Sequence, residues 1–187
     1  MNSHDWQLIS IETVQESPQV SNAIKKPEGL KWLDAISQSN SILSAILAVI
    51  HPELHGTGQK TSNQLREHSE IVDPQDMLSQ WTSAFNGVSV NFNCLTPAHQ
   101  DGKSRRQWYD LLVTLGCYQN CNLELPGLGI SLEYGPGTVV GLMGSTLEHQ
   151  VSHFEGERVC YAYFMRDIVH EWAKVLGNSW MKASYYR

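Results

Sequence analysis

Apolar side chains recur at helical spacing in the first part of the chain. From Pro27 they follow at intervals of three and four residues as far as Ile50, where His51-Pro52 ends the pattern. A proline is well placed near a helix start, so this run predicts one core-facing helix, or two short helices broken near residues 37–40. The other elements expected here are an edge strand over 6–12, a loop over 52–58, a helix over 61–68, and a helix from Asp73-Pro74 to about Ala84.

After Gly87 the apolar residues occupy every second position. Val88, Val90 and Phe92 alternate with polar side chains, which is typical of a half-buried strand. Further short apolar runs follow, separated by glycine, proline and asparagine. Seven or so short strands in about 80 residues imply a β-sandwich or a barrel. The later runs are 111–115, 122–125, 130–134, 138–142, 146–151 and 158–165, and a closing helix is expected from Asp167 to Leu176.

The composition is that of an ordinary globular protein. The chain has 187 residues, of which 41% are hydrophobic and 17% charged, so we expect one compact domain. No apolar run reaches the roughly 18 residues of a membrane span, and residues 1–10 lack the basic and apolar regions of a secretory signal. We therefore expect an intracellular monomer, nuclear or cytoplasmic, that is not secreted and binds no membrane. Its four cysteines are expected to be reduced thiols.

The net charge of −6 is concentrated in the first part of the chain. Residues 1–80 hold ten acids and five bases, whereas residues 81–187 hold nine acids and eight bases. This balance excludes a protein that holds nucleic acid through a strongly basic face. The one basic cluster is Lys103, Arg105 and Arg106, so a polyanionic partner would have to be bound locally there.

His99, Asp101 and His149 are the candidate metal ligands. Residues two apart in an extended segment project from the same face, so His99 and Asp101 can reach one ion. A histidine from a distant strand completes a set of two imidazoles and one carboxylate, which suits non-haem Fe(II) because it leaves coordination positions open. A His-x-Asp pair alone is weak evidence, because eight histidines and seven aspartates in 187 residues give roughly 0.3 such pairs by chance. His153 is the alternative third ligand.

Arg158 strengthens this interpretation. It follows His149 by nine residues, beyond a turn that contains Gly156, at the start of an apolar strand. A strand, a turn and a returning strand would bring its guanidinium to the far side of the same cavity. A buried arginine needs an anionic partner, and the planar guanidinium can hold a carboxylate through two parallel hydrogen bonds. The distal carboxylate of a dicarboxylic cosubstrate meets that need.

Together these residues resemble the Fe(II)/2-oxoglutarate dioxygenases, and especially the small fungal members of their TET/JBP-like branch. His99-x-Asp101, His149 and Arg158-x-Cys160 are similar to the iron and 2-oxoglutarate motifs. The resemblance covers roughly residues 85–167. It also includes Asn91-Phe92-Asn93, Glu124-Leu125-Pro126, Pro136-Gly137, and Leu147-x-His149-x-Val151 followed by Gly156.

The resemblance implies an α+β fold, a double-stranded β-helix (a jelly-roll or cupin-like barrel) with helices packed on one outer face. A single dioxygenase domain would then span 1–187, with mainly helical support in 1–86, the barrel in 87–166 and a C-terminal helix in 167–187. The implied cofactors are Fe(II), 2-oxoglutarate as cosubstrate and O2. The residues expected to bind the cosubstrate are Arg158, Cys160, Asn91 and Asn93. The two asparagines could instead contact a base, or form hydrogen bonds with backbone groups inside the barrel.

The implied reaction is oxidation of the methyl group of a modified base in DNA, 5-methylcytosine and/or N6-methyladenine, with methylated DNA as the partner. Two positions depart from the family pattern. Cys160 replaces a common serine and is a poorer hydrogen-bond donor, and Ser104 stands where Asn or Asp often faces the flipped base. The residues expected to contact phosphate are Lys103, Arg105 and Arg106, and those expected to stack on an extruded base are Trp108 and Tyr109.

Two other classes of function remain open. One is a 2-oxoglutarate oxygenase that hydroxylates a protein side chain or a small molecule, which the acidic balance favours. The other is a catalytically silent barrel that acts as a binding module, against which the intact ligand spacing argues.

Overall fold

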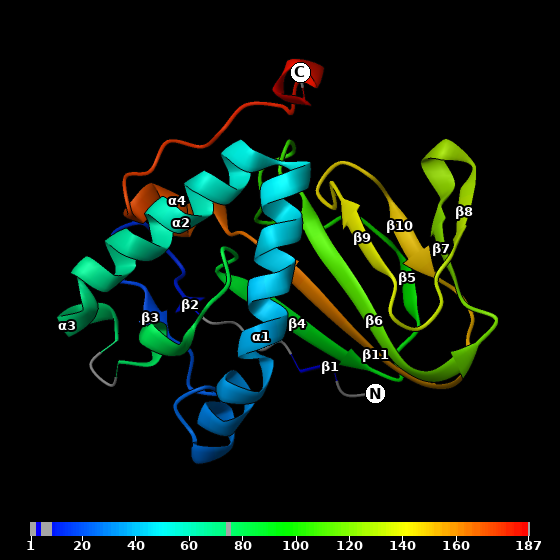
Figure 1. Cartoon of the computed structure of the whole chain (residues 1–187), viewed down its shortest axis with the longest axis horizontal. Coiled ribbons are helices and arrows are strands. Elements are labelled where there is room, and N and C mark those ends of the chain that lie inside the picture. Colours follow the sequence, from blue (N-terminus) through cyan, green and yellow to red (C-terminus); the bar gives the residue numbers. More distant parts are fainter. Residues whose placement is uncertain (1–2, 5–8, 74–75, 187) are drawn as a thin grey trace. The chain divides into compact units, whose positions relative to one another are not determined.

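The computed structural model describes residues 3–4, 9–73 and 76–186 (Figure 1). By its internal contacts the chain forms two compact units. One comprises Met1–Asp5 and Val88–Phe164, and the other comprises Trp6–Gly87 and Met165–Arg187. The expectation of a single domain stays a prediction.

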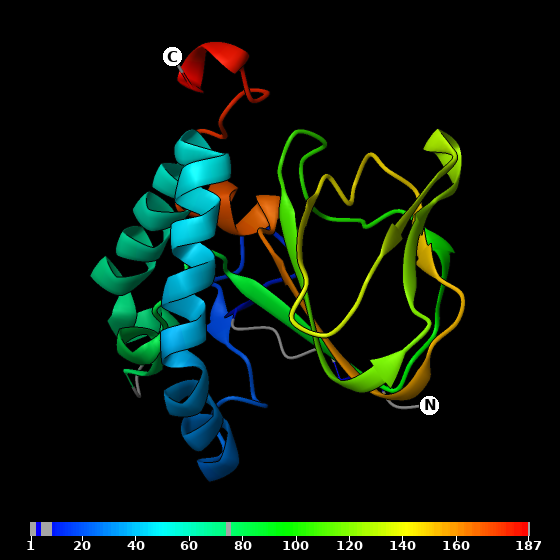
Figure 2. The same ribbon diagram turned by 45° about the vertical axis from the view of Figure 1, so that its right-hand side comes forward.

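The first unit contains two β-sheets, and the chain passes back and forth between them (Figures 1 and 2). The five-stranded sheet has the order β1-β4-β11-β6-β9, and the four-stranded sheet has the order β5-β10-β7-β8. The long pair β6 and β11 runs antiparallel. The strands are β1 Ser3–His4, β4 Gly87–Phe92, β5 Thr96–His99, β6 Asp110–Gln119, β7 Asn122–Leu125, β8 Ile130–Glu133, β9 Val139–Leu142, β10 His149–Val151 and β11 Glu155–Phe164.

A hydrophobic core fills the space between the two sheets. Leu112 of β6 and Leu142 of β9 come from one sheet, and Leu123 of β7 and Val151 of β10 come from the other. These four residues come from the apolar runs predicted over 111–115, 122–125, 138–142 and 146–151. Phe92, which the alternation over 88–92 predicts to face inward, is instead 52% exposed. The architecture is a double-stranded β-helix, which confirms the predicted fold class.

Strand β5, like β1, is a barrel strand that the apolar pattern did not indicate. Its residues Thr96–His99 include Pro97 and carry no large apolar side chain. It pairs with β10 rather than contributing to the core. A strand whose role is to present a ligand therefore leaves little trace in the hydrophobic pattern.

In the second unit, α1 spans Pro27–Ile50 as one unbroken helix, which settles the alternative of two short helices. It is long and apolar enough to cross a membrane by length and composition, which is weak evidence because the core helix of a soluble protein passes the same test. Its buried positions include Asn40 and Ser44, and the Ser44 hydroxyl accepts a hydrogen bond from the Ala84 N–H at 2.8 Å.

The loop predicted over 52–58 is wrong, because α2 spans Pro52–Glu67. Pro52 occupies the first turn, and the His51 imidazole Nδ1 accepts the Leu54 N–H at 3.3 Å, so this histidine caps the helix. Gly58 lies inside this helix and does not mark a turn. A glycine is needed there because the backbone of Ala84 packs closely against it. A Cβ at this position would stand 2.3 Å from the Ala84 carbonyl oxygen.

The helix predicted from Asp73 to Ala84 is also wrong in the residues described. Helix α3, Ser69–Val72, ends before Asp73, and the helical piece within the described part of 73–84 is the 3-10 turn η1, Met77–Gln80. Pro74 lies outside the described residues. The Asp73 carboxylate accepts the N–H of Leu78, so it organises a turn instead of starting a long helix.

The elements near the two ends of the chain are shorter than predicted. Helix α4 spans Asp167–Trp172, and Lys174 follows with a φ of 55°, so the helix stops before Gly177. Of the expected strand over 6–12, residues 6–8 lie outside the described residues, while β2, Ile9–Ser10, pairs with β3, Gln19–Val20. Beyond α4 lies the 3-10 turn η3, Ala183–Tyr186, and another 3-10 turn, η2, Pro126–Leu128, joins β7 to β8.

Two glycines of α2 allow a matched test of the packing. Gly58→Ala is expected to lower the free energy of unfolding by about 1–3 kcal/mol, because the new methyl group collides with the Ala84 carbonyl. Gly56→Ala, where nothing lies within 4 Å of the added Cβ, should raise it by roughly 0.5–1 kcal/mol through helix propensity. Urea denaturation measures both, and equal effects of the two substitutions would contradict the close approach.

Candidate metal centre

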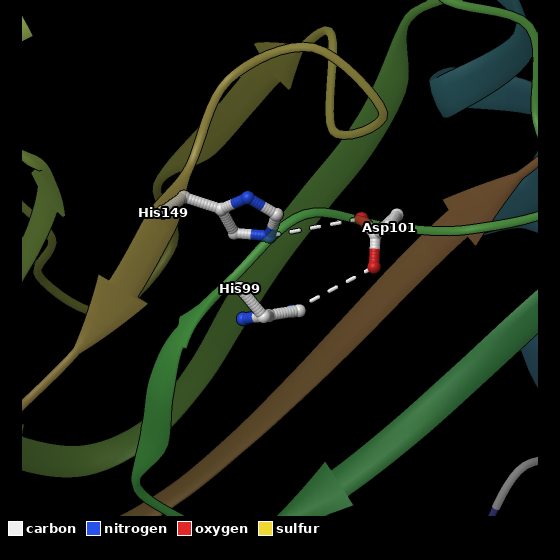
Figure 3. Close-up of side chains that lie close together, drawn as sticks. All are labelled: His99, Asp101 and His149. Carbon is white, nitrogen blue, oxygen red and sulfur yellow. Dashed lines mark ion pairs between the residues drawn. The ribbon is translucent and has the colours of Figure 1, made fainter. Parts of the chain in front are cut away.

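Two strands and the loop that follows one of them bring His99, Asp101 and His149 together (Figure 3). His99 ends β5 and His149 begins β10, and the two residues lie directly opposite each other in the antiparallel pair. Their ring centroids are 4.3 Å apart. Asp101 follows β5 by two residues, and one ligand atom from each of the three side chains lies within 4.8 Å of the others.

Backbone carbonyls orient both imidazoles. The Nδ1 atom of His99 lies 2.8 Å from the Pro97 carbonyl oxygen, and that of His149 lies 3.0 Å from the Leu147 carbonyl oxygen. A carbonyl oxygen can only accept a hydrogen bond, so each Nδ1 carries a proton and donates it. In the neutral rings the Nε2 lone pairs are then free to bind a metal, which is the usual arrangement for histidine ligands.

The carboxylate of Asp101 faces both of these nitrogens. Its Oδ1 lies 3.6 Å from Nε2 of His99, and its Oδ2 lies 3.6 Å from Nε2 of His149. Two imidazole lone pairs and an anionic carboxylate thus converge on one small volume, where a divalent cation would balance them. Two nitrogens and one oxygen donor form the set that non-haem Fe(II) sites use, so these residues fit that metal.

Solvent reaches the cluster unequally. The side chain of His149 is 6% exposed, whereas those of His99 and Asp101 are 36% and 41% exposed. His149 therefore forms the inner wall of the site, while the other two side chains face outward.

His153, the alternative third ligand, lies outside the cluster. Its side chain is exposed and its Nε2 lies 3.4 Å from Oε1 of Glu155. His153 precedes Arg158 by only five residues, too few for a strand, a turn and a returning strand, so the spacing favours His149 and the geometry agrees.

Arg158 is buried inside the barrel on β11, as the sequence predicts. Its guanidinium carbon lies 5.1 Å from the ring centroid of Tyr134 and 5.7 Å from that of Phe154, so two aromatic faces hold the cation. No carboxylate of the described residues forms an ion pair with it. A buried guanidinium held by neutral groups is suited to receive the carboxylate of a ligand.

A chain of hydroxyl groups fixes the orientation of this arginine. The Tyr118 hydroxyl donates to the Tyr134 carbonyl oxygen at 2.8 Å, so the Thr114 hydroxyl, 2.8 Å away, donates to Tyr118. Thr114 Oγ1 in turn accepts the Nε–H of Arg158 at 3.1 Å. The guanidinium is therefore held by neutral groups: Thr114 at Nε, and the side chains of Tyr118, Tyr134 and Cys160.

Cys160 and Asn93 both lie close to Arg158, in different ways. Cys160 is buried with its Sγ 3.7 Å from the Tyr134 hydroxyl, and burial raises the pKa of its thiol while Arg158 acts in the opposite direction. Asn93 accepts the backbone N–H of Arg158 through Oδ1 at 2.8 Å and donates its own N–H to the Arg158 carbonyl at 2.8 Å. Asn93 thus ties the end of β4 to β11, and Asn91 is half-buried on β4.

The segment after Asp101 carries the predicted substrate contacts. Lys103 and Arg106 are exposed, whereas the Arg105 guanidinium lies 5.4 Å from the centroid of the Trp108 ring. Trp108 is only 1% exposed, so the structure supports packing rather than base stacking for this side chain. The half-buried Tyr109 stays a stacking candidate. Ser104 is half-buried, and its Oγ atom has no hydrogen-bond partner among the described residues.

Asp110 is a buried acid beside the cluster that the sequence analysis did not single out. It begins β6 and is 2% exposed. Burial, and next the charge of Asp101, raise the pKa of its carboxyl group, while the N–H of Gly144 acts in the opposite direction. The sequence gives no signal for it, because its partner, the Gly144 N–H, is a backbone group.

Comparison with known proteins agrees with this geometry. Residues 13–167 match the family Tet_JBP, described as the oxygenase domain of the 2OGFeDO superfamily. Among solved structures, NgTET1 in complex with 5mC DNA is similar, with a TM-score of 0.64 and 16% identity over 91% of this chain and 62% of that chain. A cupin 2 conserved barrel domain protein from Salinispora arenicola has a TM-score of 0.31 and 16% identity over 47% of this chain and 70% of that one. No curated protein compared with the chain matches it.

The barrel and its His-Asp-His cluster define the class of Fe(II)- and 2-oxoglutarate-dependent oxygenases. Within that class, the chain belongs to the TET/JBP oxygenase family, whose match covers most of its length. The protein is therefore an oxidoreductase of a superfamily that uses Fe(II), 2-oxoglutarate and O2.

Substitution of His149 and of His153 tests which of the two histidines binds the metal. His149→Ala is expected to weaken Mn(II) binding by roughly a hundredfold or more, since loss of an outer-shell partner alone costs roughly 10–100-fold. His153→Ala removes an exposed imidazole outside the cluster and should leave the affinity unchanged. Titration followed by electron paramagnetic resonance of free Mn(II) measures both, and a larger loss from His153→Ala would reverse the assignment.

Proposed function

We propose that the protein oxidises the methyl group of a modified base in DNA, 5-methylcytosine and/or N6-methyladenine. The observation that carries the proposal is the shared fold with NgTET1, a protein whose structure is that of a complex with 5mC DNA, over 91% of the present chain. The chain spans 62% of the length of that protein, so the similarity supports the reaction class and leaves the choice of base to experiment.

In the proposed reaction His99, Asp101 and His149 hold Fe(II), and Arg158 binds the distal carboxylate of 2-oxoglutarate. Bound Fe(II), with 2-oxoglutarate and O2, supplies the oxidising chemistry that a methyl C–H bond requires. The chain contributes position: the backbone carbonyls fix both imidazoles. The hydroxyl of Thr114 and the ring of Tyr134 fix the guanidinium.

Access of the base limits where DNA can bind. A methyl group inside a duplex cannot reach a metal centre, so the nucleotide must be turned out of the helix, at a cost of a few kcal/mol that contacts to the strand offset. Lys103 and Arg106 follow the ligand Asp101 directly and are exposed, so they are suited to contact phosphates beside the extruded nucleotide.

Ser104 is the residue expected to face the extruded base. Its Oγ is buried and has no partner among the described residues, so one hydroxyl donor and one acceptor are available. Either an exocyclic amino group or a ring nitrogen can pair with it. The short side chain therefore supports both 5-methylcytosine and N6-methyladenine as substrates.

A second candidate follows from the charge. The net charge of −6 and the small number of bases near the site favour a 2-oxoglutarate oxygenase that hydroxylates a protein side chain or a small molecule. Membership of an oxygenase family argues against a catalytically silent binding module.

Nucleoside analysis tests the reaction. Incubation with Fe(II), 2-oxoglutarate and duplex DNA carrying either modification should yield a hydroxymethylated base or consume the methylated one, detected by mass spectrometry. Asp101→Ala should abolish the product because the carboxylate ligand is lost. Formation of succinate with every DNA left unchanged would reject DNA as substrate and favour the second candidate.

Salt dependence tests the phosphate contacts. The logarithm of DNA affinity should fall linearly with the logarithm of salt concentration, and the double substitution Lys103→Ala, Arg106→Ala should reduce the slope by about 2, since each phosphate contact contributes about 0.9. Lys60→Ala, an exposed base on α2, is the matched control and should not change the slope. Affinity that stays flat from low to physiological salt would contradict phosphate binding by this segment.

A further inference from the structure

The turn between β9 and β10 holds the loop that carries Asp101. The N–H groups of Thr146 and Leu147 both donate to the Met143 carbonyl oxygen at 2.9 Å, so residues 143–147 form a compact turn. Its Gly144 carbonyl accepts the Asp101 N–H at 2.9 Å. Three further hydrogen bonds join the turn to the same loop: Gln100 Nε2 to the Thr146 carbonyl, Ser145 Oγ to the Ser104 carbonyl, and Thr146 Oγ1 to the Arg106 carbonyl.

The same turn leads directly to the second histidine. His149 follows it by two residues and bonds through Nδ1 to the carbonyl of Leu147, the last residue of the turn. Residues 143–147 therefore contact the segments of both Asp101 and His149. A displacement of this turn would move two of the three candidate ligands together.

Gly144 joins the turn to both Asp101 and Asp110. Its carbonyl accepts the Asp101 N–H at 2.9 Å, and its own N–H donates to the buried carboxylate of Asp110. A Cβ on Gly144 would stand 2.4 Å from Oδ2 of Asp101 and 2.5 Å from Oδ2 of Asp110. Both carboxylates thus close around the α carbon of one glycine, and no other residue type fits between them.

We propose that Asp110 is a positioning residue for the metal centre, acting through the hydrogen-bonded series from its carboxylate to the Gly144 N–H and from the Gly144 carbonyl to the Asp101 N–H. The inference rests on the metal role proposed for His99, Asp101 and His149. Asp110 itself does not join the cluster of candidate ligands. What it supplies is a fixed acceptor, because its carboxylate is 2% exposed on the first residue of a core strand.

The acceptor, rather than the negative charge, is the property that matters here. The other oxygen of Asp110, Oδ1, is buried and has no hydrogen-bond partner among the described residues. The hydrogen bond that this side chain makes to the turn is therefore the one from the Gly144 N–H. An asparagine has the same shape and keeps a carbonyl oxygen that can accept the Gly144 N–H. Alanine removes the acceptor altogether.

The chain provides a matched control in Asp73. This residue is also buried, also accepts a backbone N–H, that of Leu78, with one oxygen, and also has its other oxygen without a partner. It lies in the other compact unit and is not one of the candidate ligands. Substitution of Asp73 therefore tests the general effect of losing a buried acceptor.

Mn(II) affinity, measured by electron paramagnetic resonance on the full chain, is the readout. Asp110→Ala should weaken binding by about tenfold to a hundredfold, the range for loss of an outer-shell partner. Asp110→Asn should stay within about threefold of the unmodified chain, and Asp73→Ala should bind Mn(II) normally even where it unfolds at lower temperature. Hydrogen exchange of the amides in 143–147 should rise in Asp110→Ala and stay unchanged in Asp110→Asn.

Gly144→Ala gives an independent test that leaves Asp110 in place. The added methyl group must displace one or both carboxylates, so Mn(II) binding should fall at least as far as in Asp110→Ala.

Four outcomes would overturn the inference. Normal Mn(II) binding by a folded Asp110→Ala chain would remove the positioning role, and equal losses in Asp110→Asn and Asp110→Ala would assign the effect to charge. Normal binding by Gly144→Ala would contradict the close approach of the two carboxylates. Failure of the unmodified chain to bind Mn(II) would instead reject the metal assignment, and the positioning role with it.

Discussion

The pairing of His99 with His149 across strands β5 and β10 is the constraint on which the metal centre depends. Two segments fifty residues apart must meet in one register before their imidazoles can reach a single ion. A slip of one residue would turn one ring to the opposite face of the sheet. The barrel core, to which Val151 of β10 and Leu123 of β7 contribute, fixes β10, so apolar packing two residues from His149 positions one of the two imidazoles.

The second constraint is the burial of a positive charge among neutral groups. Arg158 lies between aromatic rings and is bonded at Nε to a hydroxyl. An isolated charge is costly to bury, and the cost falls when an anion binds. In the proposed reaction, a diacid held by both the guanidinium and the metal would gain from each contact, which is a physical reason to select 2-oxoglutarate over a monocarboxylic acid.

The sequence predicts the residues of the metal site better than it predicts the helix boundaries of the second unit. Alternation after Gly87 and the spacing of His-x-Asp, His149 and Arg158 depend on local geometry and on residue types that have few other uses. The start of α2 could not be predicted in this way, since Gly58 reads as a loop signal until its contact with the Ala84 carbonyl is known. Asp110 was missed because its partner, the Gly144 N–H, belongs to the backbone and leaves no mark in the sequence.

The unequal exposure of the three candidate ligands bears on how an ion exchanges. His149 is enclosed by the barrel, while His99 and Asp101 border the solvent. His99 and Asp101 would therefore be the ligands that solvent and a chelator reach first, and exchange of a bound ion would need no opening of the sheets. A chelator such as EDTA should strip the folded protein, and reconstitution with another divalent ion should need no denaturant.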